Sequence, residues 1–163
     1  TEKYDGTSWT AGGDLNTTRN SAYGTGTLTA GLVSAGTGPA SKLAITEEYN
    51  GTAWTESGDM NEARRQTSAS GSQTAALYAG GSGPYTASCE NYDGTSWRTT
   101  ASMTTARGYL AGCGVQTASL AGGAGSSTSA LAFGGSTPSV TNATEEFTAE
   151  STAVNDPKTI DFD

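Results

Sequence analysis

Histidine is absent from the 163-residue sequence, and this absence excludes most kinds of catalytic site. Without imidazole there is no Ser–His or Cys–His relay and no histidine ligand for a metal ion. The adjacent acids Glu47-Glu48 and Glu145-Glu146 lie in strand-like segments, where neighbouring side chains point to opposite faces and do not converge. We therefore predict a protein that is not an enzyme and that binds no cofactor and no metal ion.

Basic residues are scarce as well, since Lys and Arg total 8 against 16 Asp and Glu, for a net charge of −8. An acidic surface without a basic stripe repels phosphate backbones, so nucleic acid is not an expected partner. Long apolar runs are missing, and we expect no insertion into a membrane. The two cysteines, Cys89 and Cys113, are far apart in sequence. A disulfide between them stays open, but two buried thiols are the favoured arrangement.

What the sequence does contain favours strands and turns. Glycine occurs 23 times, and only 34% of the residues are hydrophobic. Thr and Tyr favour strands, and Gly allows sharp chain reversals because it adopts positive φ without a steric penalty. No apolar stripe with the 3.6-residue period of a helix is present. We predict an all-β fold.

An internal repeat organises this composition. Four segments share a Glu followed two residues later by an aromatic residue, and in the first three an Asp/Asn-Gly-Thr-x-Trp string comes next. Each Trp is followed ten residues later by an Arg. The residues that define the repeat are Glu2, Tyr4, Trp9 and Arg19; Glu47, Tyr49, Trp54 and Arg64; Glu90, Tyr92, Trp97 and Arg107; and Glu145. A disordered linker would not need such regular aromatic spacing.

The length of the repeat narrows the architecture. The four Glu positions are 45, 43 and 55 residues apart, and the long last interval contains two similar 11-residue strings, 114–124 and 125–135. These strings indicate a duplicated inner strand, without which the period is about 44 residues, a length typical of propeller blades and helical solenoids. The glycine content disfavours helices. The repeats run over about 1–45, 46–88 and 89–143, with a closing segment at 144–163.

Each repeat is expected to contain four strands. The Asp-Gly or Asn-Gly pair between Tyr and Trp predicts a tight hairpin with a type I′ turn, in which both central residues have positive φ. Two further strands are expected after the Arg, such as Thr67–Ser70 and Thr74–Ala79, separated by Gly71 and ending at Gly80-Gly81. Four strands are the content of one propeller blade.

The repeat resembles the kelch repeat of β-propeller proteins, in which a hydrophobic strand ends in Gly-Gly and a Tyr and a Trp follow at fixed spacing. The Gly-Gly pairs here are Gly80-Gly81 and Gly134-Gly135, with Ala35-Gly36 as a degenerate copy. Four residues separate Tyr from Trp, where kelch repeats usually have about six, so this hairpin is shorter than the common form. The resemblance covers nearly the whole chain. It implies that the strand ending in Gly-Gly lies near the propeller axis and the Tyr/Trp hairpin outside.

The chain contains too few predicted blades to close a propeller ring. The segments amount to about three four-stranded blades plus an extra outer hairpin at 1–10, whereas propellers close with four to eight blades. We therefore expect that other copies of the chain, or further residues of a longer protein, complete the ring.

The amino-acid sequences of four segments are also similar to repeats in virion proteins of tailed bacteriophages, especially those of marine and cyanobacterial hosts. The segments are 4–10 (YDGTSWT), 104–107 (TTAR), 130–135 (ALAFGG) and 143–147 (ATEEF). This resemblance implies a structural or adhesive part of a virion appendage, such as a tail fibre or a tail or capsid decoration. Its partners would be other virion proteins, further copies of the chain, and a glycan or protein of the host surface. The alternatives are an intracellular kelch-type protein-interaction domain in the cytoplasm and, more remotely, a carbohydrate-acting enzyme.

Two of the repeated residue types have more than one interpretation. The Trp and Tyr residues could form sugar-binding platforms, but their repetition at a hairpin favours packing between blades. Arg19, Arg64 and Arg107 could surround an anion at the axis. The favoured role for each is an ion pair with a repeated Glu, or a cap on loop carbonyl groups.

Overall fold

The computed structural model describes residues 1–125, and every regular element within them is a β-strand. The strands are β1 (Glu2–Tyr4), β2 (Trp9–Ala11), β3 (Tyr23–Thr27), β4 (Ala30–Ser34), β5 (Thr46–Tyr49), β6 (Trp54–Ser57), β7 (Ser68–Ser72), β8 (Ala75–Ala79), β9 (Cys89–Tyr92), β10 (Trp97–Thr100), β11 (Arg107–Val115) and β12 (Ala118–Gly125). The prediction of an all-β fold is confirmed for this part of the chain.

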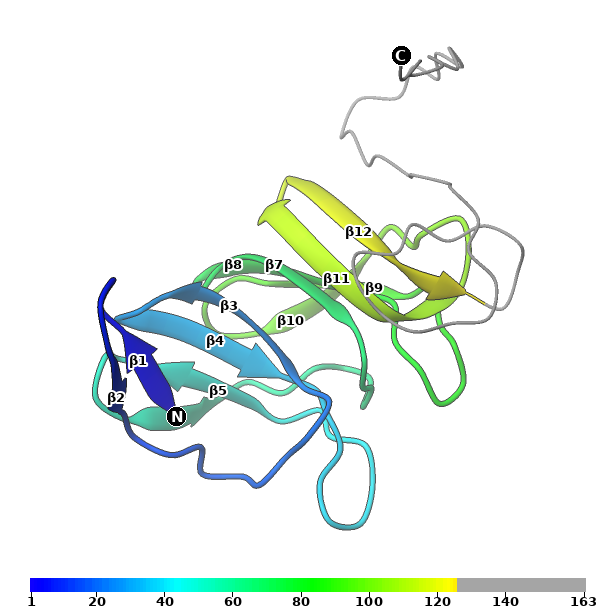
Figure 1. The fold of residues 1–163 in the computed structure, drawn as a ribbon. Helices are drawn as coiled ribbons and strands as arrows, with labels where there is room; N and C mark the ends of the chain where they lie inside the picture. Colours follow the sequence, from blue (N-terminus) through cyan, green and yellow to red (C-terminus); the bar gives the residue numbers. More distant parts are fainter. Residues whose placement is uncertain (126–163) are drawn as a thin grey trace, which may run out of the picture.

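The strands form two four-stranded antiparallel sheets flanked by two hairpins (Figure 1). One sheet has the order β3-β4-β5-β6 and the next has the order β7-β8-β9-β10, with β1-β2 before them and β11-β12 after them. The first strands of successive units, β3, β7 and β11, lie beside one another. Each sheet combines the inner hairpin of one sequence repeat with the Tyr/Trp hairpin of the next. The structural unit is therefore out of phase with the repeats drawn from the sequence.

The third expected set of four strands is described only in its inner half, β11-β12. The Gly134-Gly135 pair, Glu145 and the closing segment 144–163 lie outside the described residues.

The outer hairpins β1-β2, β5-β6 and β9-β10 place Tyr directly opposite Trp. The type I′ turn predicted for them is wrong, because only the glycine of each turn has positive φ, as at Gly94 (+95°). The preceding Asp93 instead accepts hydrogen bonds at Oδ1 from the backbone N–H groups of Ser96 (2.8 Å) and Thr95 (3.0 Å). These bonds hold the pKa of Asp93 below its ordinary range. An Asx turn of this kind reverses the chain with a single glycine.

The inner hairpins β3-β4, β7-β8 and β11-β12 each require the repeated glycine that follows the Arg by seven residues. At Gly71 φ is +99°, and a Cβ would lie 2.1 Å from the carbonyl oxygen of Ala75. Gly26 and Gly114 have the same conformation and the same close approach to the opposite strand. No side chain fits at these positions, so the repeat requires glycine there. The predicted place of Gly71 between the two strands is wrong, because Gly71 lies within β7, paired with Ala76, two residues before the hairpin tip.

The core lies between the two four-stranded sheets and contains few large side chains. Trp97 packs edge-on against Tyr78, with 5.1 Å between ring centroids, and lies 4.9 Å from the ring of Tyr92. Both tyrosines are fully buried, and Leu32 and Met60 pack in the same cluster. The aromatic residues of the outer hairpin thus supply much of the core between neighbouring sheets.

Ala35 and Gly80 occupy the same repeat position, and both adopt the left-handed backbone conformation, with φ of +62° and +65°. We expect Ala35→Gly to change the free energy of unfolding by less than about 1 kcal/mol, because relief of backbone strain offsets the loss of a buried methyl group. We expect Gly80→Ala to lower it by about 2 kcal/mol or more. The added Cβ would lie 2.4 Å from Leu110 Cδ1 and 2.7 Å from the carbonyl oxygen of Arg107. Urea denaturation measures the free energy of unfolding of both variants. Equal losses for Ala35→Gly and Gly80→Ala would contradict the close contacts assigned to Gly80.

Candidate functional site

The repeated Arg and Glu residues form buried ion pairs. Arg19 Nη2 lies 2.6 Å from Glu47 Oε1, and the two side chains are 1% and 0% exposed. Arg64 Nη2 lies 2.5 Å from Glu90 Oε1, with side chains 2% and 1% exposed. The pairing expected from the sequence is thus present in two successive units.

Each ion pair connects the loop between two sheets to the sheet that the loop enters. In the second pair, Glu90 also accepts hydrogen bonds from the backbone and the side-chain amide of Asn61, both at 2.8 Å. Arg64 donates to the carbonyl oxygen of Ser88 at 2.7 Å. The first pair repeats this pattern with its own asparagine, Asn16. Carboxylate and carbonyl oxygens already occupy these two guanidinium groups, which leaves them no role as an anion site.

The remaining members of the Arg and Glu series differ in their surroundings. Arg107 is buried at the start of β11, the position that corresponds to Arg64. Glu2 lies in β1, the strand that corresponds to β5 and β9, but its side chain is exposed. Glu145 lies outside the described residues.

The repeated Trp residues connect each outer hairpin to the one before it. Trp97 Nε1 donates to Thr46 Oγ1 at 2.9 Å, from β10 to the start of β5. Trp54 Nε1 makes the corresponding bond to Thr1 Oγ1 at 3.0 Å. A single repeated contact therefore joins three successive outer hairpins.

The tyrosine hydroxyls make the second contact between sheets. Tyr92 donates to Glu48 Oε1 at 2.5 Å and lies 2.5 Å from Ser57 Oγ, both in the preceding sheet. Burial, with the hydrogen bond to Glu48, raises the pKa of Tyr92 to about 12 and keeps the phenol as a donor. In the preceding unit Gly12 stands where Ser57 stands, and the buried hydroxyl of Tyr49 has no hydrogen-bond partner.

Two glutamines at the tips of the inner hairpins form a third contact, which the sequence interpretation missed. Gln73 Nε2 donates to the carbonyl oxygens of Gly31 (3.1 Å) and Tyr49 (2.9 Å) in the preceding sheet. Gln116 repeats both bonds one sheet later. The shared string Gln-Thr-Ala, seen at 73–75 and 116–118, is the sequence signal that could have revealed them.

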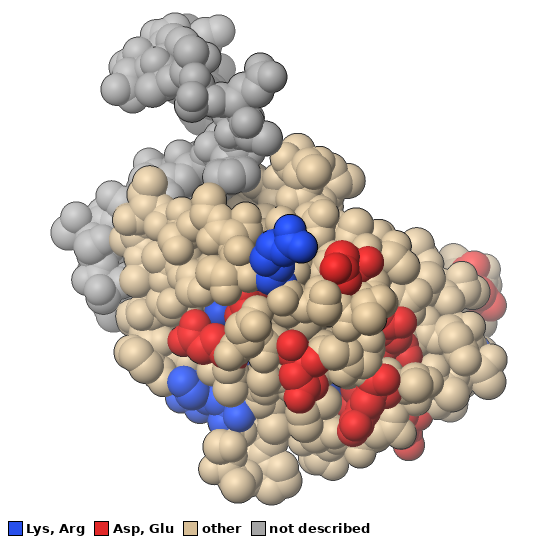
Figure 2. Space-filling view, turned by 180° about the vertical axis from the view of Figure 1, so that it is seen from behind, with Lys and Arg blue, Asp and Glu red and all other residues tan. Residues whose placement is uncertain are grey.

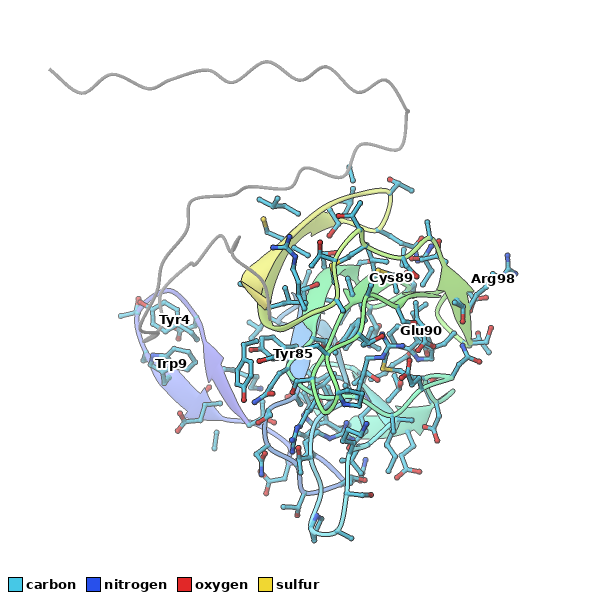
Figure 3. The ribbon with its side chains drawn as sticks, turned by 90° about the vertical axis from the view of Figure 1, so that its right-hand side faces the viewer. Tyr4, Trp9, Tyr85, Cys89, Glu90 and Arg98 are labelled. Atoms are coloured by element: carbon cyan, nitrogen blue, oxygen red, sulfur yellow. The ribbon has the colours of Figure 1, made fainter. Side chains whose placement is uncertain are left out.

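At the N-terminal hairpin, the same aromatic pair lies at the surface. Tyr4 and Trp9 are 48% and 65% exposed, against 0% for Tyr92 and 7% for Trp97. Figure 3 shows the two rings side by side on β1-β2, whereas Glu90 lies within the body of the protein. A shallow groove of about 220 Å³ beside them is lined by Lys3, Tyr4, Asp5, Thr10, Leu28, Thr29 and Gly51.

The cysteines do not form a disulfide. Cys89 is buried, as expected, but Cys113 is exposed, and both thiols are free. The expectation of two buried thiols is wrong for Cys113, because it lies toward the tip of β11, beyond the packed part of that strand. Burial raises the pKa of the Cys89 thiol.

The described residues hold no group of three or more Cys, Asp or Glu side chains placed to bind a metal ion. Among residues 1–125 there is also no helix with the length and apolar character to cross a membrane. Figure 2 shows acidic side chains spread over one face, interspersed with a few basic ones rather than bordering a basic stripe.

No protein-family model matches this sequence, and no curated protein matches it at a significant level.

Proposed function

We propose that the chain is a non-enzymatic structural or adhesive module of a phage virion appendage, built from kelch-like propeller blades. The observation that carries the proposal is the recurrence of the same types of contact at successive junctions between sheets. Trp97 and Trp54 bond to the start of the preceding outer hairpin, and Gln73 and Gln116 bond to the preceding sheet. A unit that repeats its contacts in this way rotates each sheet relative to the last by the same step, which suits a ring of blades.

The internal hydrogen bonds of the repeated polar residues support a structural role for the repeat. Two of the repeated Arg–Glu pairs and both repeated glutamines bond to one another or to backbone groups: Arg19–Glu47, Arg64–Glu90, Gln73 and Gln116. Residues used for catalysis or ligand binding usually leave part of their hydrogen-bonding capacity directed into a cleft. Here the repeated polar side chains bond to groups inside the protein, so the repeat stabilises the arrangement of the sheets. Recognition of a partner would then depend on the loops.

Two features support the location in a virion: the sequence similarity of the repeats to phage virion proteins, and the amino-acid composition of the chain. Only 15% of the residues are charged, and Gly is abundant, a composition that favours an extracellular or virion protein over an intracellular one. In this role the rigid sheets carry loops that contact other virion proteins and a glycan or protein of the host surface.

Immunogold electron microscopy tests the location. An antibody raised against the chain is expected to label the tail or the capsid surface of tailed phage particles from lysates of marine cyanobacteria. Pre-immune serum on the same particles is the control. Labelling confined to the cytoplasm of uninfected cells would contradict the proposal and favour an intracellular interaction domain.

A further inference from the structure

The hairpin β1-β2 stands in the place of the outer half of a sheet. Thr1 accepts a hydrogen bond from Trp54 just as Thr46 accepts one from Trp97. In the complete sheets the strand that corresponds to β1 pairs on its other side with an inner strand, as β5 pairs with β4 and β9 with β8. Among the described residues, β1 pairs with β2 alone. One edge of β1 therefore offers unpaired backbone groups to another strand.

The hairpin β11-β12 stands in the place of an inner half. Gln116 at its tip bonds to the preceding sheet as Gln73 does from the tip of β7-β8. The start of β12 (118–120, Ala-Ser-Leu) matches the starts of β4 (30–32, Ala-Gly-Leu) and β8 (75–77, Ala-Ala-Leu). Within residues 1–125, β12 pairs with β11 alone, and none of these residues pairs with the edge that meets a Glu-x-Tyr strand in the other sheets.

We propose that β12 of one copy pairs antiparallel with β1 of a second copy, so that two half sheets from different chains form one four-stranded sheet. The register follows from β4-β5, in which Gly31, Leu32 and Val33 lie opposite Tyr49, Glu48 and Glu47. In the joint sheet Ser119, Leu120 and Ala121 lie opposite Tyr4, Lys3 and Glu2 of the second copy. Ser119 is small, like Gly31 and Ala76 at the same position, and leaves room for the tyrosine.

A buried polar atom without a partner supports this assignment independently. Asn91 Oδ1 is buried and accepts no hydrogen bond. Asn91 occupies the position of Glu48, whose carboxylate accepts the hydroxyl of Tyr92 from the next sheet. In the joint sheet the corresponding tyrosine is Tyr4 of the second copy, whose hydroxyl in the isolated chain turns to the carbonyl of Gly6 in its own turn. An amide oxygen is a suitable acceptor for that phenol.

The exposed apolar side chains at the N-terminal end are also consistent with coverage by β11-β12 of a second copy. Trp9 is 65% exposed, Tyr4 48% and Leu28 50%. Tyr4 and Leu28 line one groove, and the ring of Trp9 packs against that of Tyr4. Leu28 occupies the hairpin-tip position of Gln73 and Gln116, which touch the preceding sheet. Addition of a β11-β12 hairpin along β1 would supply that preceding sheet and cover all three side chains. A clustered apolar surface of this kind typically marks an interface.

Within one copy the two edges do not meet, because β1 and β12 lie apart and do not pair (Figure 1). If the blades close into a ring, which rests on the proposed propeller architecture, each chain contributes two complete sheets and one joint sheet. A dimer then contains six sheets, within the range of about four to eight that closed propellers use. The competing occupant for β12 is residues 144–147 of the same chain, which carry the fourth Glu-x-aromatic string.

Site-directed cross-linking of the full 163-residue chain tests the pairing. Two differently tagged chains, both with Cys89→Ala and Cys113→Ser, carry Lys3→Cys in one and Leu120→Cys in the other. Mixing under mild oxidation is expected to give a disulfide-linked heterodimer, because opposed residues of neighbouring strands place their Cβ atoms within disulfide reach. The matched control replaces Leu120→Cys by Glu56→Cys, an exposed position on β6, and is expected to give little product.

Native mass spectrometry of the unmodified chain is expected to show a dimer. A monomer, or a dimer in which the Lys3–Leu120 pair cross-links no better than the control, would overturn the proposal. So would a disulfide within one chain that carries Leu120→Cys and Glu146→Cys, because residues 144–147 would then occupy the edge of β12. None of these outcomes bears on the virion role, which the antibody labelling decides separately.

Trp9→Ala gives a second measurement that does not depend on cross-linking. Trp9 is largely exposed in one copy, so its removal is expected to leave the isolated fold intact. In the dimer it would be an aromatic anchor, and its loss is expected to raise the dissociation constant at least about tenfold. Glu56→Ala is the control and should leave the constant unchanged. An unchanged constant in Trp9→Ala would contradict the proposed interface.

Discussion

Arg64→Ala is expected to lower the free energy of unfolding by about 3–5 kcal/mol, because it leaves the carboxylate of Glu90 buried without its counter-charge. The two side chains are 2% and 1% exposed and 2.5 Å apart, so water cannot replace the guanidinium group. Loss of the bond to the Ser88 carbonyl adds to the effect. Urea denaturation followed by tryptophan fluorescence measures the change.

The second acidic neighbour of Arg64 provides the control. Glu62 lies 3.1 Å from the same guanidinium group, but its side chain is 54% exposed. Glu62→Gln should therefore cost less than about 1 kcal/mol. The double variant Arg64→Met/Glu90→Leu should recover much of the lost stability, because it removes both buried charges together. A loss below about 1 kcal/mol for Arg64→Ala would show that the carboxylate is solvated, contrary to the structure.

Trp97→Ala is the other change with a large expected effect, also about 3–5 kcal/mol. The indole is 7% exposed, contacts Tyr78 and Tyr92, and donates to Thr46 in the preceding sheet. Truncation would open a cavity between two sheets that have few other large side chains to fill it. Thermal and urea denaturation should both register the loss, and it should be independent of protein concentration.

Trp9 is the matched control for Trp97, because the two residues share their local sequence and their place in the hairpin. Trp9 is 65% exposed in one copy, so Trp9→Ala should cost less than about 1 kcal/mol in dilute solution. A larger cost at high protein concentration would follow from loss of the joint sheet. Equal costs for the two variants at every concentration would contradict the difference in burial that the structure shows.

Local features of the fold could be predicted from the sequence. The glycine after each Arg indicates where the inner hairpin lies, although Gly71 is two residues before the hairpin tip and not between the strands as predicted. Its backbone conformation and close approach to the opposite strand exclude any side chain. The spacing of Tyr and Trp predicts their opposition across two strands, since that depends only on hairpin geometry. The repeated Arg and Glu suggested their ion pair, because isolated buried charges need a partner.

Features that depend on neighbouring units could not be predicted in the same way. Trp9 and Trp97 occur in the same Asp-Gly-Thr-Ser-Trp string, yet one is exposed and the other buried, because only Trp97 has a complete sheet before it. The turn type was missed because the Asp93 side chain competes with the backbone for the same N–H groups.

The central claim is that successive sheets are held together by the repeated polar and aromatic residues of the outer hairpins. A double-mutant cycle between Glu48 and Tyr92, whose side chains meet across a junction at 2.5 Å, tests it most directly. With Glu48→Ala and Tyr92→Phe, each of which removes the hydrogen bond, we expect a coupling free energy of about 1–2 kcal/mol. A control cycle between the exposed Glu56 and Tyr92 should give no coupling free energy. A coupling below about 0.3 kcal/mol for Glu48 and Tyr92 would contradict the account.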